Sequence, residues 1–130
     1  MSEFVEELFT FLSDQGTDAG SRIYPQQLPQ GVTLPACRYF RVSNPKDHSH
    51  SGPSSLKRPR IQIDCYAENY LGAVRLATQL ENVLDGFQGM MGSHTVGAAF
   101  VEDAGRDDYD PETGRHRVSV DVVIWNTKEA

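Results

Sequence analysis

The chain has 130 residues, of which 38% are hydrophobic, and this length is enough for one domain with a single core. Its net charge of −6 argues against a nucleic-acid-binding protein, because Lys and Arg that neutralise phosphates supply most of that affinity. Its apolar runs are far shorter than the roughly 20 residues that span a bilayer. Glu3, Glu6 and Glu7 stand where a signal peptide would be basic. We therefore expect a cytosolic chain at synthesis, with no membrane partner and with two reduced cysteines.

The charges are segregated along the chain. Residues 38–60 carry six basic side chains and only one acidic one, whereas residues 102–112 carry six acidic side chains and only one basic one. One interpretation is that both segments are solvated loops. The other is that the basic segment of one molecule meets the acidic segment of its neighbour, a head-to-tail contact that can close into a ring.

The first predicted element is a helix over about Glu3–Ser13, with Ser2 as its N-cap. Its apolar positions are spaced by three or four residues and form one stripe: Phe4, Leu8, Phe11 and Leu12. Residues 22–25 then form a short extended piece. Several prolines in residues 25–35 exclude helix and indicate a loop across the surface of the domain.

Three features are expected between this loop and the centre of the chain. A strand is predicted over about Ala36–Ser43. The segment of about 44–57 has two prolines, four serines and almost no apolar residue before Leu56, which indicates a mobile hairpin arm that becomes ordered against a partner. From Arg60 to Tyr66 polar and apolar residues alternate as in a half-buried strand.

A second helix follows this strand, because the period changes to three or four residues after Ala67. Its apolar stripe runs from Ala73 to Phe87. Strands are then predicted over about 95–104 and 116–126, with an acidic turn region over 105–114. Val123 and Trp125 interrupt the alternation of the last strand by placing apolar groups on its polar face. Either a helix covers them or they contact another protein.

The order of elements is helix, strand, strand, helix, strand, strand. This order predicts an α+β fold: one domain over residues 1–130, with a four-stranded, mainly antiparallel sheet made of two hairpins and two helices packed on one face.

No residue pattern supports an enzyme, a metal or a cofactor. His48 and His50 could supply half of a metal site, but further ligands at useful spacing are lacking. Cys37 and Cys65 lie on strands expected to be neighbours and are interpreted as small core residues. The spacing of Asp108, Asp110 and Glu112 lacks the glycine and the closing glutamate of a calcium loop, so a turn is the simpler interpretation.

Two segments carry a resemblance to a known family. Arg22-Ile23-Tyr24-Pro25, followed by a Gln/Pro/Gly stretch, and the strand Arg60-Ile61-Gln62-Ile63-Asp64-Cys65-Tyr66-Ala67 resemble the tail-completion proteins of long-tailed bacteriophages, also called tail terminators or neck proteins. The helix after this strand and the closing strand from Val118 to Trp125 also fit, so the resemblance covers nearly the whole chain.

The resemblance implies a structural virion protein without enzymatic activity. It would cap the finished tail tube as a homo-oligomeric ring, usually a hexamer, and join it to the head. Its partners would be copies of itself, the tail tube protein and the head–tail connector or neck proteins, and DNA would pass through the lumen without specific binding. The protein would be located in the tail–neck region of the virion and, during assembly, in the host cytoplasm.

Eight residues are the candidates for the subunit or partner interface. The basic side would contain Lys57, Arg58 and Arg60, and the acidic side Asp107, Asp108 and Asp110. The hydrophobic contact with the tube or the neighbouring subunit would contain Val123 and Trp125.

Two alternative functions remain open. One is a small dimeric ligand-binding or regulatory domain with a ferredoxin-like sheet and a pocket between sheet and helices. The other is an enzyme that uses Cys65 with a histidine.

Overall fold

The structure is a computed structural model that describes residues 3–45 and 56–128. Within these ranges it contains two helices and six strands. In chain order they are α1 (Phe4–Ser13), β1 (Ile23–Pro25), β2 (Ala36–Ser43), β3 (Arg60–Ala67), α2 (Tyr70–Leu84), β4 (Gly89–Met91), β5 (His94–Asp110) and β6 (Arg115–Lys128). Most of the predicted hairpin arm, including His48 and His50, lies outside the described residues, as does the predicted N-cap Ser2.

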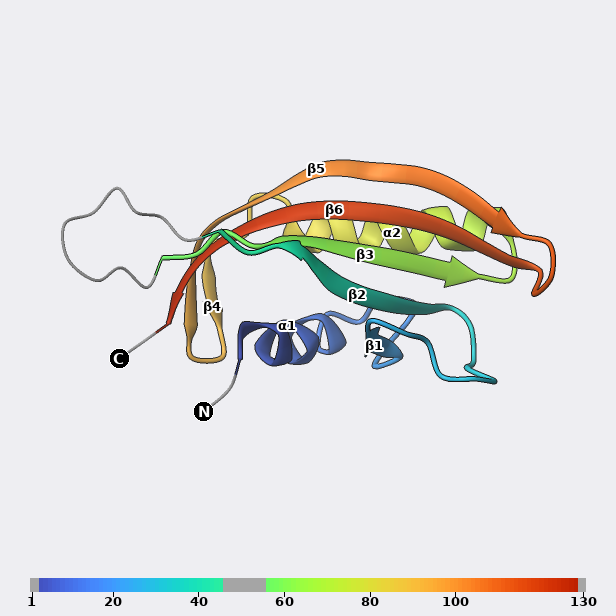
Figure 1. The fold of residues 1–130 in the computed structure, drawn as a ribbon, viewed down its shortest axis with the longest axis horizontal. Helices are drawn as coiled ribbons and strands as arrows, with labels where there is room; N and C mark the ends of the chain where they lie inside the picture. The colour runs from blue at the N-terminus through green and yellow to red at the C-terminus, as the bar shows by residue number, and fades with distance from the viewer. Residues whose placement is uncertain (1–2, 46–55, 129–130) are drawn as a thin grey trace.

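All six strands form one sheet in the order β1-β2-β3-β6-β5-β4. The strands β1 and β2 are parallel, and every other neighbouring pair is antiparallel. The sheet is mixed and curls as a half-barrel around the helices (Figure 1). The predicted α+β class is therefore right, but the predicted four-stranded antiparallel sheet is wrong.

The two additional strands are the short outer ones, β1 and β4. Each has three residues, so neither is long enough to display the alternation that identifies a strand in a sequence. Backbone pairing defines them instead: Ile23 lies opposite Cys37 in the parallel pair, and Met91 lies opposite His94 across a tight turn.

The strand β5 is much longer than expected. It has 17 residues and includes most of the segment interpreted as an acidic turn, so the turn itself is confined to residues 111–114. Three register shifts against β6 interrupt its alternation, between Val96 and Ala98 and on both sides of Asp103. Bulges of this kind place consecutive polar residues on a strand, which explains why the sequence resembles a loop.

One hydrophobic core lies between the helices and the sheet. Fully buried side chains from α1, α2 and all six strands form it, among them Leu8, Leu76, Ile63 and Val120. Asn69 caps α2 by accepting a hydrogen bond from the Gly72 amide at 2.7 Å. Glu3 is the N-cap of α1, and its amide donates to Glu6 Oε1 at 3.0 Å. Because both helices pack into this core, the opposite face of the sheet is available for contacts.

Candidate interaction surfaces

The outer face of the sheet, opposite the helices, carries an aromatic and basic cluster. Phe100 of β5 lies opposite Val123 of β6, which also lies opposite Arg60 of β3. Phe100 is 53% exposed. The guanidinium of Arg58 lies 5.5 Å from the centre of the Trp125 ring, a cation–π geometry. We call these five residues, Arg58, Arg60, Phe100, Val123 and Trp125, the outer patch.

The outer patch unites four of the eight predicted interface residues and adds one. Val123 and Trp125 are partly exposed and lie outside the core that the helices cover, so their contact with another protein stays a prediction. Phe100 was missed because its alternation with Val96 and Ala98 indicates one face for all three. The register shift between Val96 and Ala98 leaves Val96 buried and Phe100 exposed beside Val123.

The three predicted acidic residues lie near the tip of the β5–β6 hairpin. Asp107 accepts a hydrogen bond from the Tyr70 hydroxyl at 2.7 Å, and Asp108 pairs with Arg117 at 2.8 Å. Asp110 stabilises the turn, because its carboxylate accepts from the Glu112 amide and the Thr113 hydroxyl, each at 3.0 Å. These hydrogen bonds lower the pKa of Asp110, and the bond from the Glu112 amide has the largest effect.

The acidic tip and the outer patch lie at opposite ends of the long hairpin (Figure 1). Arg60 lies opposite Val123 and Asp107 lies opposite Val118, five positions apart on β6, which corresponds to roughly 17 Å along the strand at about 3.3 Å per residue. Arg60 therefore does not reach Asp107 within one molecule and forms an ion pair with Glu102 instead.

A buried carboxylate stabilises the middle of the outer face. Asp64 is fully buried and accepts hydrogen bonds from Arg38 Nε at 2.6 Å, Ser119 Oγ at 2.6 Å and Gln62 Nε2 at 2.8 Å. Burial alone would raise the pKa of Asp64, but these three hydrogen bonds outweigh it and hold the pKa below its ordinary value. The network crosses β2, β3 and β6, so it fixes the central strands on which the outer patch depends.

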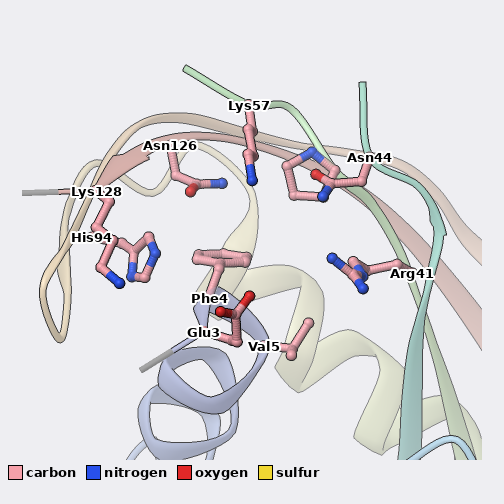
Figure 2. A pocket seen from close by; sticks show the side chains of 10 residues that line it. Glu3, Phe4, Val5, Arg41, Asn44, Lys57, His94, Asn126 and Lys128 are labelled. Atoms are coloured by element: carbon pink, nitrogen blue, oxygen red, sulfur yellow. The ribbon is translucent and has the colours of Figure 1, made fainter. Parts of the chain in front are cut away.

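A basic pocket of about 230 Å³ lies beside the first turn of α1 (Figure 2). The predicted residue Lys57 lines it, together with Arg41, His94 and Lys128, which no pattern in the sequence marks as neighbours. Main-chain hydrogen bonds in both directions between Lys57 and Asn126, at 2.9 and 2.8 Å, fix the backbone of Lys57 at the pocket rim. Lys57 therefore belongs to this pocket and not to the outer patch.

Glu7 connects α1 to the turn between β4 and β5, next to the pocket. Its Oε1 accepts from the Ser93 amide at 3.2 Å and from the Ser93 hydroxyl at 3.0 Å, and these bonds lower the pKa of Glu7. The same oxygen lies 3.9 Å from His94 Nδ1. Burial lowers the pKa of His94, while the nearby Glu7 carboxylate opposes that shift. The imidazole is therefore mainly neutral near pH 7.

The two cysteines are buried in the core, away from any surface that a substrate could reach. Cys37 and Cys65 are directly opposite each other on β2 and β3 and are fully buried. Burial raises the pKa of the Cys65 thiol well above its ordinary value, so the thiolate that nucleophilic chemistry requires is disfavoured. Among residues 3–45 and 56–128, no cluster of His, Cys, Asp and Glu side chains could hold a metal ion. Nor does this part of the chain have a helix long and apolar enough to cross a membrane.

The comparison with protein families decides the relationship. The family model of "Tail completion protein gp17" matches residues 12–127, which is most of the chain. The chain belongs to the tail-completion family. It is a structural protein of a phage-type tail, as the resemblance of the Arg60–Ala67 strand implied.

A solved structure supports the same fold. The chain superimposes with a TM-score of 0.58 on a chain from the "Virion of native gene transfer agent (GTA) particle", covering 95% of this chain and 94% of that one. The two sequences are 11% identical, so this likeness concerns the fold. No curated protein sequence matches the chain.

Proposed function

We propose that this tail-completion protein caps the finished tail tube as a homo-oligomeric ring, a hexamer, and joins the tail to the neck of the virion. The single observation that carries the proposal is the family match over residues 12–127. Assembly would take place in the host cytoplasm, with the tail tube protein and the head–tail connector proteins as partners. The net charge of −6 supports free passage of DNA through such a ring, because like charges repel.

The position of the charges supports a head-to-tail contact between subunits. The acidic tip with Asp107, Asp108 and Asp110 would approach the basic end that contains Lys57, Arg58 and Arg60 of the next subunit. A contact between two different surfaces repeats around a ring when the rotation closes. The internal partners of these side chains do not prevent it, since exposed ion pairs are worth only about 0–1 kcal/mol and can exchange.

The outer patch supports an apolar component of the contact with the tube or the neighbouring subunit. Phe100 exposes about half of its side chain, which is roughly 100 Å² of the ~150–250 Å² that an aromatic residue buries. At about 25 cal/mol per Å² this area would contribute about 2.5 kcal/mol when it is covered. Val123 and Trp125 extend the same surface.

A ligand-binding domain with a pocket between sheet and helices is less well supported. That space holds the packed core, with residues such as Leu76, Leu80 and Ile63 fully buried. The family match also favours a tail protein. We therefore retain a single proposed function.

Binding of the purified protein to tail tubes assembled without it tests the proposal. We expect saturable binding at one tube end, and loss of binding in the Phe100→Ser variant. Leu71→Ser is the matched control, because Leu71 is 70% exposed but lies on α2, away from the outer patch. Tubes that bind no wild-type protein would refute the capping function.

Charge reversal tests the subunit contact separately. Arg58→Glu combined with Arg60→Glu should weaken self-association and remove its salt dependence, whereas Arg75→Glu on the exposed side of α2 should change neither. Sedimentation velocity across a salt series measures both. If the reversed protein still forms rings on tubes, the electrostatic contact is wrong although the capping function stands.

A further inference from the structure

The basic pocket next to α1 is built from segments that are distant in the sequence. Arg41 comes from the end of β2, Lys57 from the segment before β3, His94 from β5 and Lys128 from β6. Figure 2 shows their side chains arranged around one hollow with the first turn of α1 at its floor. The two described lysines of the chain both line this pocket.

The charged groups of the pocket are only partly compensated. Neither Arg41 nor the side chain of Lys57 has a hydrogen bond or ion pair with another side chain of the described residues. Glu3 also lines the pocket, and Glu7 beside it acts on His94 and Lys128. Arg41 and Lys57 are therefore the cations that carry the argument for a negative ligand.

Two further features favour a negative ligand. The helix α1 begins at Phe4, which lines the pocket, and the N-terminus of a ten-residue helix carries a partial positive charge. His94 is 5% exposed and its Nδ1 has no hydrogen-bond partner among the described residues. A buried polar atom without a partner is costly. An anion in the pocket would favour protonation of the His94 ring, and the charged ring would then be stabilised by Glu7, which lies 3.9 Å from Nδ1.

The geometry points to an oxyanion-binding site formed by Arg41, Lys57, His94 and Lys128 at the N-terminus of α1, which takes one compact carboxylate or phosphate-type group. A volume of about 230 Å³ suits a single such group and its water, and the mouth is lined by the long cationic side chains. The site is distinct from the outer patch and shares only Lys57 with the proposed contact between subunits. Its occupant is either a free tetrahedral anion or a carboxylate presented by a protein partner.

Binding should be linked to protonation of His94. Glu7 and Glu3 favour the imidazolium, whereas burial, Lys128 and Lys57 disfavour it, and the net effect is a lowered pKa. Arg41 adds a further positive charge at the pocket. An anion in the pocket offsets the cations and raises the pKa of His94. By linkage, the affinity for the anion increases as the pH falls towards the lowered pKa of His94 in the free protein.

The experiment is a titration of the full chain with sulfate and, separately, with acetate, at constant ionic strength set with chloride. The His94 ring and the amides of α1 are followed by NMR. We expect saturable shifts for at least one anion, with at least tenfold weaker binding in Lys57→Met and Arg41→Met. Glu3→Gln should bind several-fold more tightly, because it removes the competing carboxylate. Arg75→Met, which removes an exposed cation elsewhere, should bind as the wild type does.

The two arms distinguish the source of the ligand. Preference for sulfate indicates a phosphate-type anion, whereas comparable or tighter binding of acetate indicates a carboxylate of a protein partner. Shifts that do not saturate, or that Arg41→Met and Arg75→Met reduce equally, would overturn the site. Arg41 is exposed, so its variant keeps the test valid even if Lys57→Met is unstable.

Discussion

Asp64→Asn should destabilise the protein strongly, although the residue lies on the face of the sheet opposite the core. The asparagine retains one oxygen for Ser119 and Gln62, but its amide nitrogen replaces the oxygen that accepts from Arg38 Nε at 2.6 Å. One charge-assisted hydrogen bond, worth about 1.5–3 kcal/mol, is lost and two donors face each other.

The exposure of Arg38 limits this cost. Its side chain is 30% exposed, so it can turn towards water after the substitution, unlike a fully buried cation. We expect a loss of about 2–3 kcal/mol. For a chain of this length that corresponds to a fall in Tm of roughly 8–12 °C, at about 4 °C per kcal/mol.

Thermal and urea unfolding followed by circular dichroism measure the effect. Arg106→Gln is the matched control, because it removes an ion pair with Asp121 in which Arg106 is 45% exposed; it should cost less than about 1 kcal/mol. If Asp64→Asn unfolds within about 0.5 kcal/mol of the wild type, the network does not stabilise the sheet and our reasoning is refuted.

The same network predicts a dependence on pH. The pKa of Asp64 is lower in the folded protein than its ordinary value of 3.8, so its contribution is complete above that value. The contribution is lost as the pH falls below 3.8 through the folded pKa. Wild-type stability should therefore decline more steeply with acid than that of Asp64→Asn, which has no carboxyl to protonate at this position.

Three further predictions concern local structure. Gly92→Ala should cost about 2–3 kcal/mol of stability, because Gly92 has a φ of +60° and an added Cβ would lie 1.6 Å from Glu7 Oε2. Gly114→Ala is the control, because Gly114 has a φ of +71° with open space around it. It should cost only about 1 kcal/mol in the same urea titration. Cys65 should not react with an aromatic disulfide reagent until the protein unfolds, and a fast reaction in the native state would contradict its burial. Asn69→Ala should lower stability by about 1 kcal/mol through loss of the α2 cap, whereas an unchanged Tm would mean that the bond to Gly72 contributes nothing.

The long regular elements of this fold could be predicted from the sequence. In β3 and β6 strict alternation marks Ile61, Ile63, Val118 and Val120 as core residues, and the structure buries all four. The stripe of α2 was equally clear. These segments have one buried face each, so their periodicity records the fold directly.

The rest of the fold depends on pairing that periodicity does not record. The strands β1 and β4 are defined by their partners, and the register shifts around Asp103 disguise β5 as a turn. The sheet therefore has two more strands than the sequence predicts, and one of them forms the parallel pair. No local pattern distinguishes a three-residue strand at the edge of a sheet from a loop.

The candidate surfaces divide in the same way. Val123 and Trp125 could be identified because they break the alternation of β6, and the structure leaves them outside the core. The Asp64 network could not, because an acidic residue on a strand's polar face is ordinarily solvated. The pocket could not either: it joins Arg41, His94 and Lys128 from three different strands, and only the tertiary fold brings them together.

Electron cryomicroscopy of tails assembled without this protein, and then incubated with it, tests the proposed function most directly. We expect a ring of six copies at the head-proximal end of the tube, with the acidic hairpin tip of each subunit against the basic end of the next. Density at the distal end of the tail, or tube ends that stay bare at saturating protein, would contradict it.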